Sequence, residues 1–176
     1  DANRRSFPVE PRLLRAFCEV DGQFLWTIDS AGSIKHRHRV DQDIKYEKSI
    51  HSDIEIIECK LSPNGDYLAF LTGDSRTEVW SRNPLKKLWS YGQPGELRRS
   101  TLDWTADGDL LASLIDRQTI AIFDGKTGKI ICQKDMGNLV WDAAFLADST
   151  LLVSTGRDLR ICPLNDSNWY PLAVGE

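Results

Sequence analysis

The chain has 176 residues, of which 41% are hydrophobic, and its formal net charge is −4 at pH 7. This length is enough to bury a substantial core, and the acidic balance excludes a general affinity for nucleic acids while leaving room for a local basic patch. The longest apolar runs are too short for a membrane-spanning helix, and no apolar stretch follows the first basic residues as in a signal peptide.

The first predicted elements are an N-terminal arm and then a series of short strands. Residues 1–12 hold two prolines and three arginines without a clear period, which is typical of an arm or linker. From residue 13 onward, short apolar strands alternate with polar turns in four successive blocks. We place these blocks at approximately 13–50, 51–94, 95–136 and 137–176.

A tight turn joins the first two strands of each block. The turns are marked by Asp21-Gly22, Asn64-Gly65, Asp107-Gly108 and Asp148-Ser149, at intervals of 43, 43 and 41 residues. Asx-Gly between apolar runs is a strong hairpin signal, because Gly and Asn tolerate the positive φ that such turns require. A period of roughly 40–45 residues with several short strands per unit is the signature of propeller blades.

The positions around each turn also repeat. Four residues before the marker stand Cys18, Leu61, Trp104 and Phe145, and six before it stand Ala16, Cys59, Leu102 and Ala143. Because the two offsets differ by two residues, both columns lie on one face of the first strand. We expect Trp104 and Phe145 to be buried between neighbouring blades. The second strand carries an apolar pair two and three residues after the marker, at Phe24-Leu25, Tyr67-Leu68, Leu110-Leu111 and Leu151-Leu152.

The third and fourth strands complete each block. The third strand contains Arg37-His38, Trp80-Ser81, Phe123-Asp124 or Cys162-Pro163, and a polar turn with Asp29, Asp74, Asp116 or Asp158 precedes it. The fourth strands are expected at roughly 43–48, 86–91, 129–134 and 168–173. The pattern therefore predicts an all-β fold of four four-stranded antiparallel sheets.

Two stretches connect this pattern to a known family. The sequence LSPNGDYLA at 61–69 resembles the WD40 phrase FSPDGKYLA, and TIAIFD at 119–124 resembles TVRVWD. The resemblance covers roughly residues 13–173 in four degenerate copies, none of which keeps an intact Trp-Asp pair. It implies WD40-like β-propeller blades. Four blades leave three arrangements open: part of a larger ring, a ring completed by another chain, or a compact four-bladed ring.

The residues that carry chemistry are few. Cys18, Cys59, Cys132 and Cys162 lack metal-site spacing and are expected to be buried thiols in a reducing compartment, which favours the cytoplasm, with a Cys18–Cys59 disulfide as the alternative. His36 and His38 share one face of a strand, but a metal site would need a third ligand such as Asp41 or Asp43. The sequence predicts no catalytic residue, no metal and no cofactor.

A basic strand in the first block is the most unusual segment. Lys35, Arg37 and Arg39 share one face of it and are candidates for contact with an acidic protein partner. Trp89 and Trp141 lie near strand ends and are further candidates as interface anchors. We expect a non-catalytic protein-interaction scaffold with no membrane or nucleic-acid partner. The alternatives are a sensor propeller of a larger multidomain protein of the apoptosome-ATPase type, and a propeller enzyme of the hydrolase or quinoprotein type.

Overall fold

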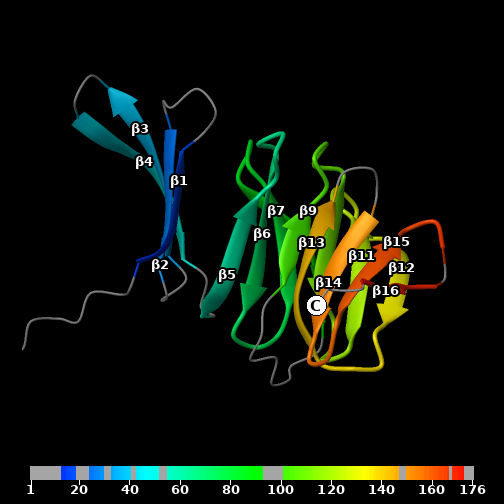
Figure 1. Cartoon of the computed structure of the whole chain (residues 1–176). Helices are drawn as coiled ribbons and strands as arrows, with labels where there is room; N and C mark the ends of the chain where they lie inside the picture. The colour runs from blue at the N-terminus through cyan, green and yellow to red at the C-terminus, as the bar shows by residue number, and fades with distance from the viewer. Residues whose placement is uncertain are drawn as a thin grey trace, which may run out of the picture. The chain divides into compact units, whose positions relative to one another are not determined.

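The structure is a computed structural model that describes residues 13–18, 24–29, 33–40, 43–51, 55–92, 101–146, 150–166 and 168–172. These residues form four four-stranded antiparallel sheets, as predicted, and no helix occurs among them (Figure 1). The chain divides into two compact units, residues 1–53 and 54–176. The predicted arm at 1–12 lies outside the described residues.

The first unit contains one sheet, which we call blade one. Its strands follow chain order: β1 (Leu13–Cys18), β2 (Phe24–Asp29), β3 (Ser33–Val40) and β4 (Asp43–His51). In the turn between β2 and β3, the Ser33 amide donates to the Asp29 carboxylate at 3.0 Å. Ile28 and Ile34 are paired across β2 and β3 and are both buried. The predicted polar turn therefore joins β2 and β3 into a hairpin, and the paired isoleucines give one face of this hairpin an apolar character.

The second unit contains three sheets, again with strands in chain order. Blade two comprises β5 (Ile56–Leu61), β6 (Tyr67–Thr72), β7 (Thr77–Ser81) and β8 (Lys86–Tyr91). Blade three comprises β9 (Leu102–Trp104), β10 (Leu110–Leu114), β11 (Thr119–Asp124) and β12 (Ile130–Asp135). Blade four comprises β13 (Val140–Leu146), β14 (Thr150–Thr155), β15 (Leu159–Pro163) and β16 (Tyr170–Leu172). The first strand of each blade lies innermost, because β9 contacts both β5 and β13 (Figure 1).

The turns between first and second strands have the predicted geometry. Gly65 and Gly108 adopt φ of 76° and 79°, the left-handed region that glycine occupies without steric cost. The turn of blade two also touches that of blade three, since the Asn64 side-chain amide donates to the Asp107 carbonyl at 3.1 Å. A Cβ on Gly108 would lie 2.7 Å from the Asn64 side chain. Glycine at 108 therefore serves both the turn and the contact between blades.

The turn of blade four is one residue shorter than that of blade three. Trp104 pairs with Leu111 in blade three, seven positions later, whereas Phe145 pairs with Leu151, six positions later. The sequence columns aligned Leu152 with Leu111, and that alignment is wrong by one position. Because side chains alternate between the faces of a strand, Leu151 takes the place of Leu111, and Leu152 lies on the opposite face of the sheet.

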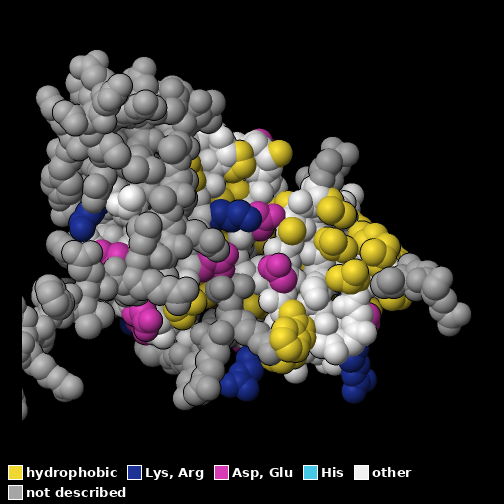
Figure 2. Space-filling view, turned by 60° about the vertical axis from the view of Figure 1, so that its left-hand side comes forward, with side chains coloured by type: hydrophobic (Ala, Val, Ile, Leu, Met, Phe, Trp, Pro, Cys, Tyr) yellow, Lys and Arg dark blue, Asp and Glu magenta, His cyan; other side chains and the backbone are white. Residues whose placement is uncertain are grey.

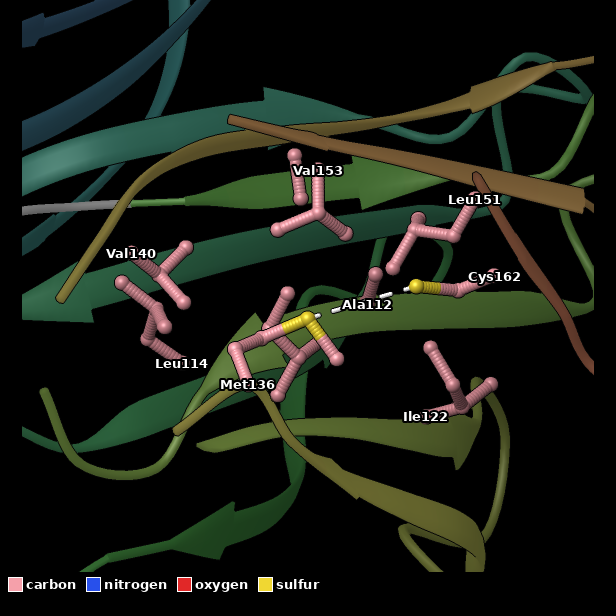
Figure 3. Close-up of a cluster of buried hydrophobic side chains, with 10 residues drawn as sticks. Ala112, Leu114, Ile122, Met136, Val140, Leu151, Val153 and Cys162 are labelled. Atoms are coloured by element: carbon pink, nitrogen blue, oxygen red, sulfur yellow. Dashed lines mark hydrogen bonds between the residues drawn. The ribbon is translucent and has the colours of Figure 1, made fainter. Parts of the chain in front are cut away.

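Apolar clusters fill the spaces between successive blades. In blades three and four, we call the side of the sheet that faces the preceding blade its trailing face, and the other side its leading face. Between blades three and four lie Ala112, Leu114, Ile120, Ile122, Met136, Val140, Ala143, Leu151, Val153 and Cys162 (Figure 3). Between blades two and three lie Ala69, Leu71, Val79, Leu102, Trp104, Leu111, Ala121 and Phe123. Trp104 is 4% exposed, as expected for its column. Phe145 is half-buried, short of the burial expected, because it packs at the margin of its cluster.

Polar and aromatic contacts join the blades beyond these clusters. The Asp103 carboxylate on β9 accepts from Lys60 Nζ on β5 at 2.5 Å and from the Phe145 amide on β13 at 2.6 Å. Near the outer strands, Trp89 stacks on Phe123 with ring centroids 5.2 Å apart. Asp103 thereby links the inner strands of three blades, while Trp89 links β8 to the next sheet.

The cysteines agree with the prediction of buried thiols as far as the structure describes them. Cys59 and Cys162 are buried, Cys132 is half-buried, and none of the three forms a disulfide bond. Burial raises the pKa of the Cys132 and Cys162 thiols. The side chain of Cys18 lies outside the described part of the structure.

Candidate protein-interaction surface

The blades of the second unit have two kinds of end. One end carries the turns after the first and third strands, and the other carries the turn after the second strand and the connection into the next blade. At the second end, backbone hydrogen bonds tie turns to connections. The Val140 amide donates to the Arg117 carbonyl at 2.9 Å, and the Gly156 amide donates to the Leu139 carbonyl at 2.8 Å. These bonds make this end a rigid platform.

Aspartates hold the turns of this end together. The Asp158 carboxylate accepts from Thr155 Oγ1 at 2.6 Å and from Arg160 Nε at 2.8 Å. The hydrogen bonds from Arg160 and Thr155 lower the pKa of Asp158. For Asp116, burial raises the pKa, but hydrogen bonds from Gln118 and Thr119 outweigh it, so the pKa is lowered. Both carboxylates are therefore ionised at neutral pH, and the hydrogen bonds that they accept stabilise the turns.

Trp141 lies on this platform at a bulge in β13. The pairing of β13 with β14 shifts between Val140 and Asp142, so Trp141 is the extra residue. The inner strands of blades one and two shift at the same place, with Leu14 and Ile57 as the extra residues. A bulge redirects a side chain out of the regular alternation. Trp141 is accordingly 51% exposed.

Two arginines flank Trp141. Arg117 lies in the turn between β10 and β11. Its backbone carbonyl accepts a hydrogen bond from the amide of Val140, the residue before Trp141. Arg157 follows Gly156, and a Cβ on Gly156 would lie 3.3 Å from Trp141 Nε1. The side chains of Arg117 and Arg157 are both exposed. We call Trp141, Arg117 and Arg157 the Trp141 surface.

The composition of this surface suits protein recognition. Tryptophan and arginine are the residues most enriched at the energetic centres of protein interfaces. Guanidinium groups form bidentate hydrogen bonds with carboxylates, and exposed aromatic rings pack against apolar side chains. The backbone bonds that fix the turns reduce the entropy lost on binding.

The sequence-predicted binding residues fall in different environments. Trp141 is exposed as an anchor requires, whereas Trp89 is half-buried and donates from Nε1 to the Gly125 carbonyl at 2.9 Å. Lys35 is half-buried in β3. The side chains of Arg37 and Arg39 lie outside the described part of the structure, but the register of β3 is described: Arg37 pairs with Leu25 as Trp80 pairs with Leu68.

Arg117 and Arg157 were not predicted from the sequence. Each lies in the turn after the second strand of its blade, next to a predicted turn aspartate. The sequence signal that could have identified them is an arginine beside the turn aspartate in each of blades three and four. Their position beside Trp141 depends on the packing of successive blades.

The part of the chain that the structure describes offers no group of three His, Cys, Asp or Glu residues able to hold a metal ion. Within the same residues, no helix has the length and apolar character needed to cross a membrane.

Comparisons with known proteins agree with this architecture. The profile of the family described as "Anaphase-promoting complex subunit 4 WD40 domain" matches residues 59–144. The fold is similar to that of the C-terminal WD40 domain of Sif2, seen in a crystal structure, with a TM-score of 0.73 over 90% of this chain and 10% sequence identity. This chain spans 48% of that chain. No curated protein matches the sequence at a significant level. Together with the sixteen described strands, these matches show that the chain is a WD40-like β-propeller of four degenerate repeats.

Proposed function

We propose that the chain is a non-catalytic protein-interaction scaffold and that it binds an acidic protein segment at the Trp141 surface. The observation that carries this proposal is Trp141 itself, which is 51% exposed on a platform fixed by backbone hydrogen bonds. Leaving a large aromatic side chain in water forgoes the stabilisation that its burial would bring. Burial of Trp141 against a partner protein recovers this stabilisation.

The comparisons support a role in an assembly. The matched family is named for a subunit of a complex, the anaphase-promoting complex. Binding residues lie disproportionately on loops that a rigid scaffold positions, as the turns of these blades are. As a further part of the proposal, the ring is completed by additional blades of the same protein or of another chain, and the buried thiols Cys59 and Cys162 suit a reducing location such as the cytoplasm.

The test compares binding partners captured by the wild-type chain and by variants of the Trp141 surface. We expect Trp141→Ala to weaken binding by about 2 kcal/mol or more, roughly 30-fold, as for a central interface anchor. The double variant Arg117→Glu and Arg157→Glu should weaken binding further and reduce its salt dependence, because it removes the attraction for carboxylates.

A matched control reverses charge at the opposite end of the blades. Lys126 and Lys129 lie in the turn between β11 and β12, and the side chains of both are exposed. Lys126→Glu and Lys129→Glu should leave the captured partners unchanged. Retention of every partner by the Trp141 surface variants would refute this assignment of the binding surface.

A further inference from the structure

Three sulfur-bearing side chains lie in the cluster between blades three and four. Cys162 on β15 and Met136, directly after β12, are both 0% exposed, and the half-buried Cys132 on β12 packs against the same cluster. The sulfur atoms of Cys162 and Met136 point toward each other and lie 4.0 Å apart (Figure 3). Hydrophobic side chains also occur on the surface of the chain (Figure 2). The sulfur atoms, rather than apolar character, therefore distinguish this cluster.

The interface between blades two and three holds aromatic rings at the equivalent positions. Trp89 stacks on Phe123 with ring centroids 5.2 Å apart, and Tyr91 meets the ring of Phe123 at an angle, with centroids 5.1 Å apart. The three rings thus fill the space between the outer strand of one blade and the third strand of the next. Packing at these positions therefore requires neither sulfur nor charge.

Strand pairing identifies the residues at these positions in the next interface. Cys132 and Lys134, on the leading face of blade three, replace the tryptophan and the tyrosine, and Cys162, on the trailing face of blade four, replaces the phenylalanine. The equivalent pairs are Cys132 with Ile122 and Trp89 with Val79, Lys134 with Ile120 and Tyr91 with Thr77, and Cys162 with Leu151 and Phe123 with Leu111. Two thiols thus lie on opposite sides of this interface, with an amine on the side of Cys132.

Lys134 is the anomalous member of this cluster. Its side chain belongs to a residue that is only 5% exposed, and its amine forms no hydrogen bond or ion pair with any residue that the structure describes. Burial raises the pKa of the Cys132 and Cys162 thiols, and the charge of Lys134 acts against this rise at both. Burying a positive charge without a partner is costly, so a negative charge at the thiols would stabilise Lys134.

Asp166 does not serve as the partner of Lys134. Its carboxylate accepts from the Tyr170 hydroxyl at 2.6 Å and from the Asn168 amide at 2.9 Å. These hydrogen bonds lower the pKa of Asp166, and the charge of Lys134 contributes in the same direction without an ion pair. In the described part of the structure, the amine of Lys134 therefore has no direct counter-charge.

The donor set of this cluster suits a soft metal ion. Thiolate and thioether sulfurs favour Cu(I), whereas structural zinc takes four ligands drawn from Cys, His and carboxylates. The described residues offer no group of three His, Cys, Asp or Glu for zinc. A metal–thiolate bond is about 2.3 Å long, so two sulfur ligands of one ion lie within about 4.6 Å of each other. The 4.0 Å separation of the Cys162 and Met136 sulfurs meets this limit.

The charges of such a site balance. Each thiol releases its proton to water when it binds the metal, so two thiolates and one Cu(I) ion together carry a single negative charge. The amine of Lys134 neutralises that charge in the apolar interior between the blades.

We propose that Cys132, Cys162 and Met136 bind one Cu(I) ion between blades three and four, with Lys134 as the neutralising cation. The ion joins β12 to β15, because the two cysteines belong to different blades. The half-buried Cys132 lies on the side from which the ion enters. This inference goes beyond the scaffold function and depends neither on the Trp141 surface nor on completion of the ring.

The test titrates the reduced full chain with Cu(I) under anaerobic conditions, in competition with bicinchoninate, a chromophoric chelator of Cu(I). We expect one tightly bound ion per chain and an X-ray absorption spectrum with sulfur ligands. Because the fold brings these sulfurs together, Cu(I) should bind the folded chain more tightly than the unfolded chain, and the urea midpoint should rise on binding.

Substitutions separate this site from the other thiols of the chain. Cys132→Ser and Cys162→Ala should each abolish tight binding, and Met136→Leu, which keeps an apolar side chain of similar size, should weaken it. The matched control is the double variant Cys18→Ala and Cys59→Ala, which should still bind one ion. Circular dichroism checks the fold of each variant, and if Cys162→Ala does not fold, Cys132→Ser at the half-buried position decides.

Lys134→Met tests the role of the amine, because it keeps a long side chain and removes the charge. The variant should raise the urea midpoint of the metal-free chain, since it removes a buried charge. It should also lower the affinity for Cu(I) about 10–100-fold, as loss of a group next to metal ligands typically does. A lysine with a structural role alone would leave the affinity for the metal unchanged.

The opposite results overturn the proposal. If bicinchoninate removes all Cu(I) from the wild-type chain, or if Cys132→Ser binds as tightly as the wild type, the sulfur atoms only pack against each other. Loss of binding in the Cys18→Ala and Cys59→Ala control assigns the metal to those thiols instead. Capture of partners by the Trp141 surface is measured without Cu(I), so failure of this inference leaves the scaffold function standing.

Discussion

Single side chains between the blades contribute unequally to stability. Trp104 is 4% exposed, stacks on Tyr67 with centroids 6.0 Å apart, and donates from Nε1 to the Lys60 carbonyl at 3.3 Å. Phe145 occupies the same column in blade four but is only half-buried. The cost of truncating a core side chain grows with the buried apolar volume that is removed and with the cavity left behind.

We therefore expect Trp104→Ala to destabilise the chain by about 3–5 kcal/mol, and Phe145→Ala to cost clearly less. Urea unfolding followed by circular dichroism measures both. Leu88→Ala is a suitable control, since Leu88 is 38% exposed on β8. An equal loss of stability for Trp104→Ala and Leu88→Ala would show that the Trp104 column does not carry the packing between blades.

At the scale of the element, the turns depend on ionised aspartates. Hydrogen bonds from Thr105 and from the Asp109 amide lower the pKa of Asp107, and bonds from the Thr127 side chain and amide lower that of Asp124. A carboxyl whose pKa is lower in the folded than in the unfolded state stabilises the fold at pH values above its unfolded pKa, roughly 4. That stabilisation is lost as the pH falls through the folded pKa.

Stability should therefore fall as the pH is lowered from about 5 to about 3. Asp107→Asn and Asp124→Asn keep the side-chain shape but remove the titration, so the double variant should be less stable at pH 7 and show a shallower decline. Thermal unfolding across this pH range measures the effect. A decline as steep as that of the wild type would mean that other groups dominate the acid response.

At the scale of the whole molecule, charge is distributed unevenly. The chain carries a net charge of −4, yet β3 of blade one contains Lys35, Arg37 and Arg39 at alternate positions. Blades two and three have Trp80 and Phe123 in the register of Arg37. Blade one thus differs from blades two and three in the polarity of its third strand, and an acidic protein partner would complement it.

The triple variant Lys35→Glu, Arg37→Glu and Arg39→Glu should weaken binding of an acidic partner and remove its sensitivity to salt between about 0.05 and 0.5 M. The matched control is the double variant Lys45→Glu and Lys48→Glu on β4. By register, Lys45 pairs with His38 and Lys48 with His36, so both are on the face of the sheet opposite to that of Lys35, Arg37 and Arg39. Capture from a native extract, quantified at several salt concentrations, compares the two. If the triple variant keeps its partners, the Trp141 surface becomes the stronger candidate.

The sequence by itself determined the repeat, the strands and the turn chemistry. Turn residues such as Gly65 and Gly108 act through their own backbone preferences, and the alternation along each strand depends on neighbours in the chain. These local effects are strong enough for the strands and turns to be predicted from the sequence without knowledge of the tertiary contacts. The WD40 resemblance followed from the same local phrases.

Only the tertiary structure decided which residues meet. The shortened turn of blade four exchanges Leu151 and Leu152 between faces, and no local propensity reveals a one-residue change of register. The approach of Arg117 and Arg157 to Trp141, and the burial of Trp89 against Phe123, arise where separate blades pack together. Local interactions therefore fix each blade from its own sequence, whereas the exposed surfaces depend on packing between residues that lie far apart in the chain, as Trp89 and Gly125 do at a separation of 36 positions.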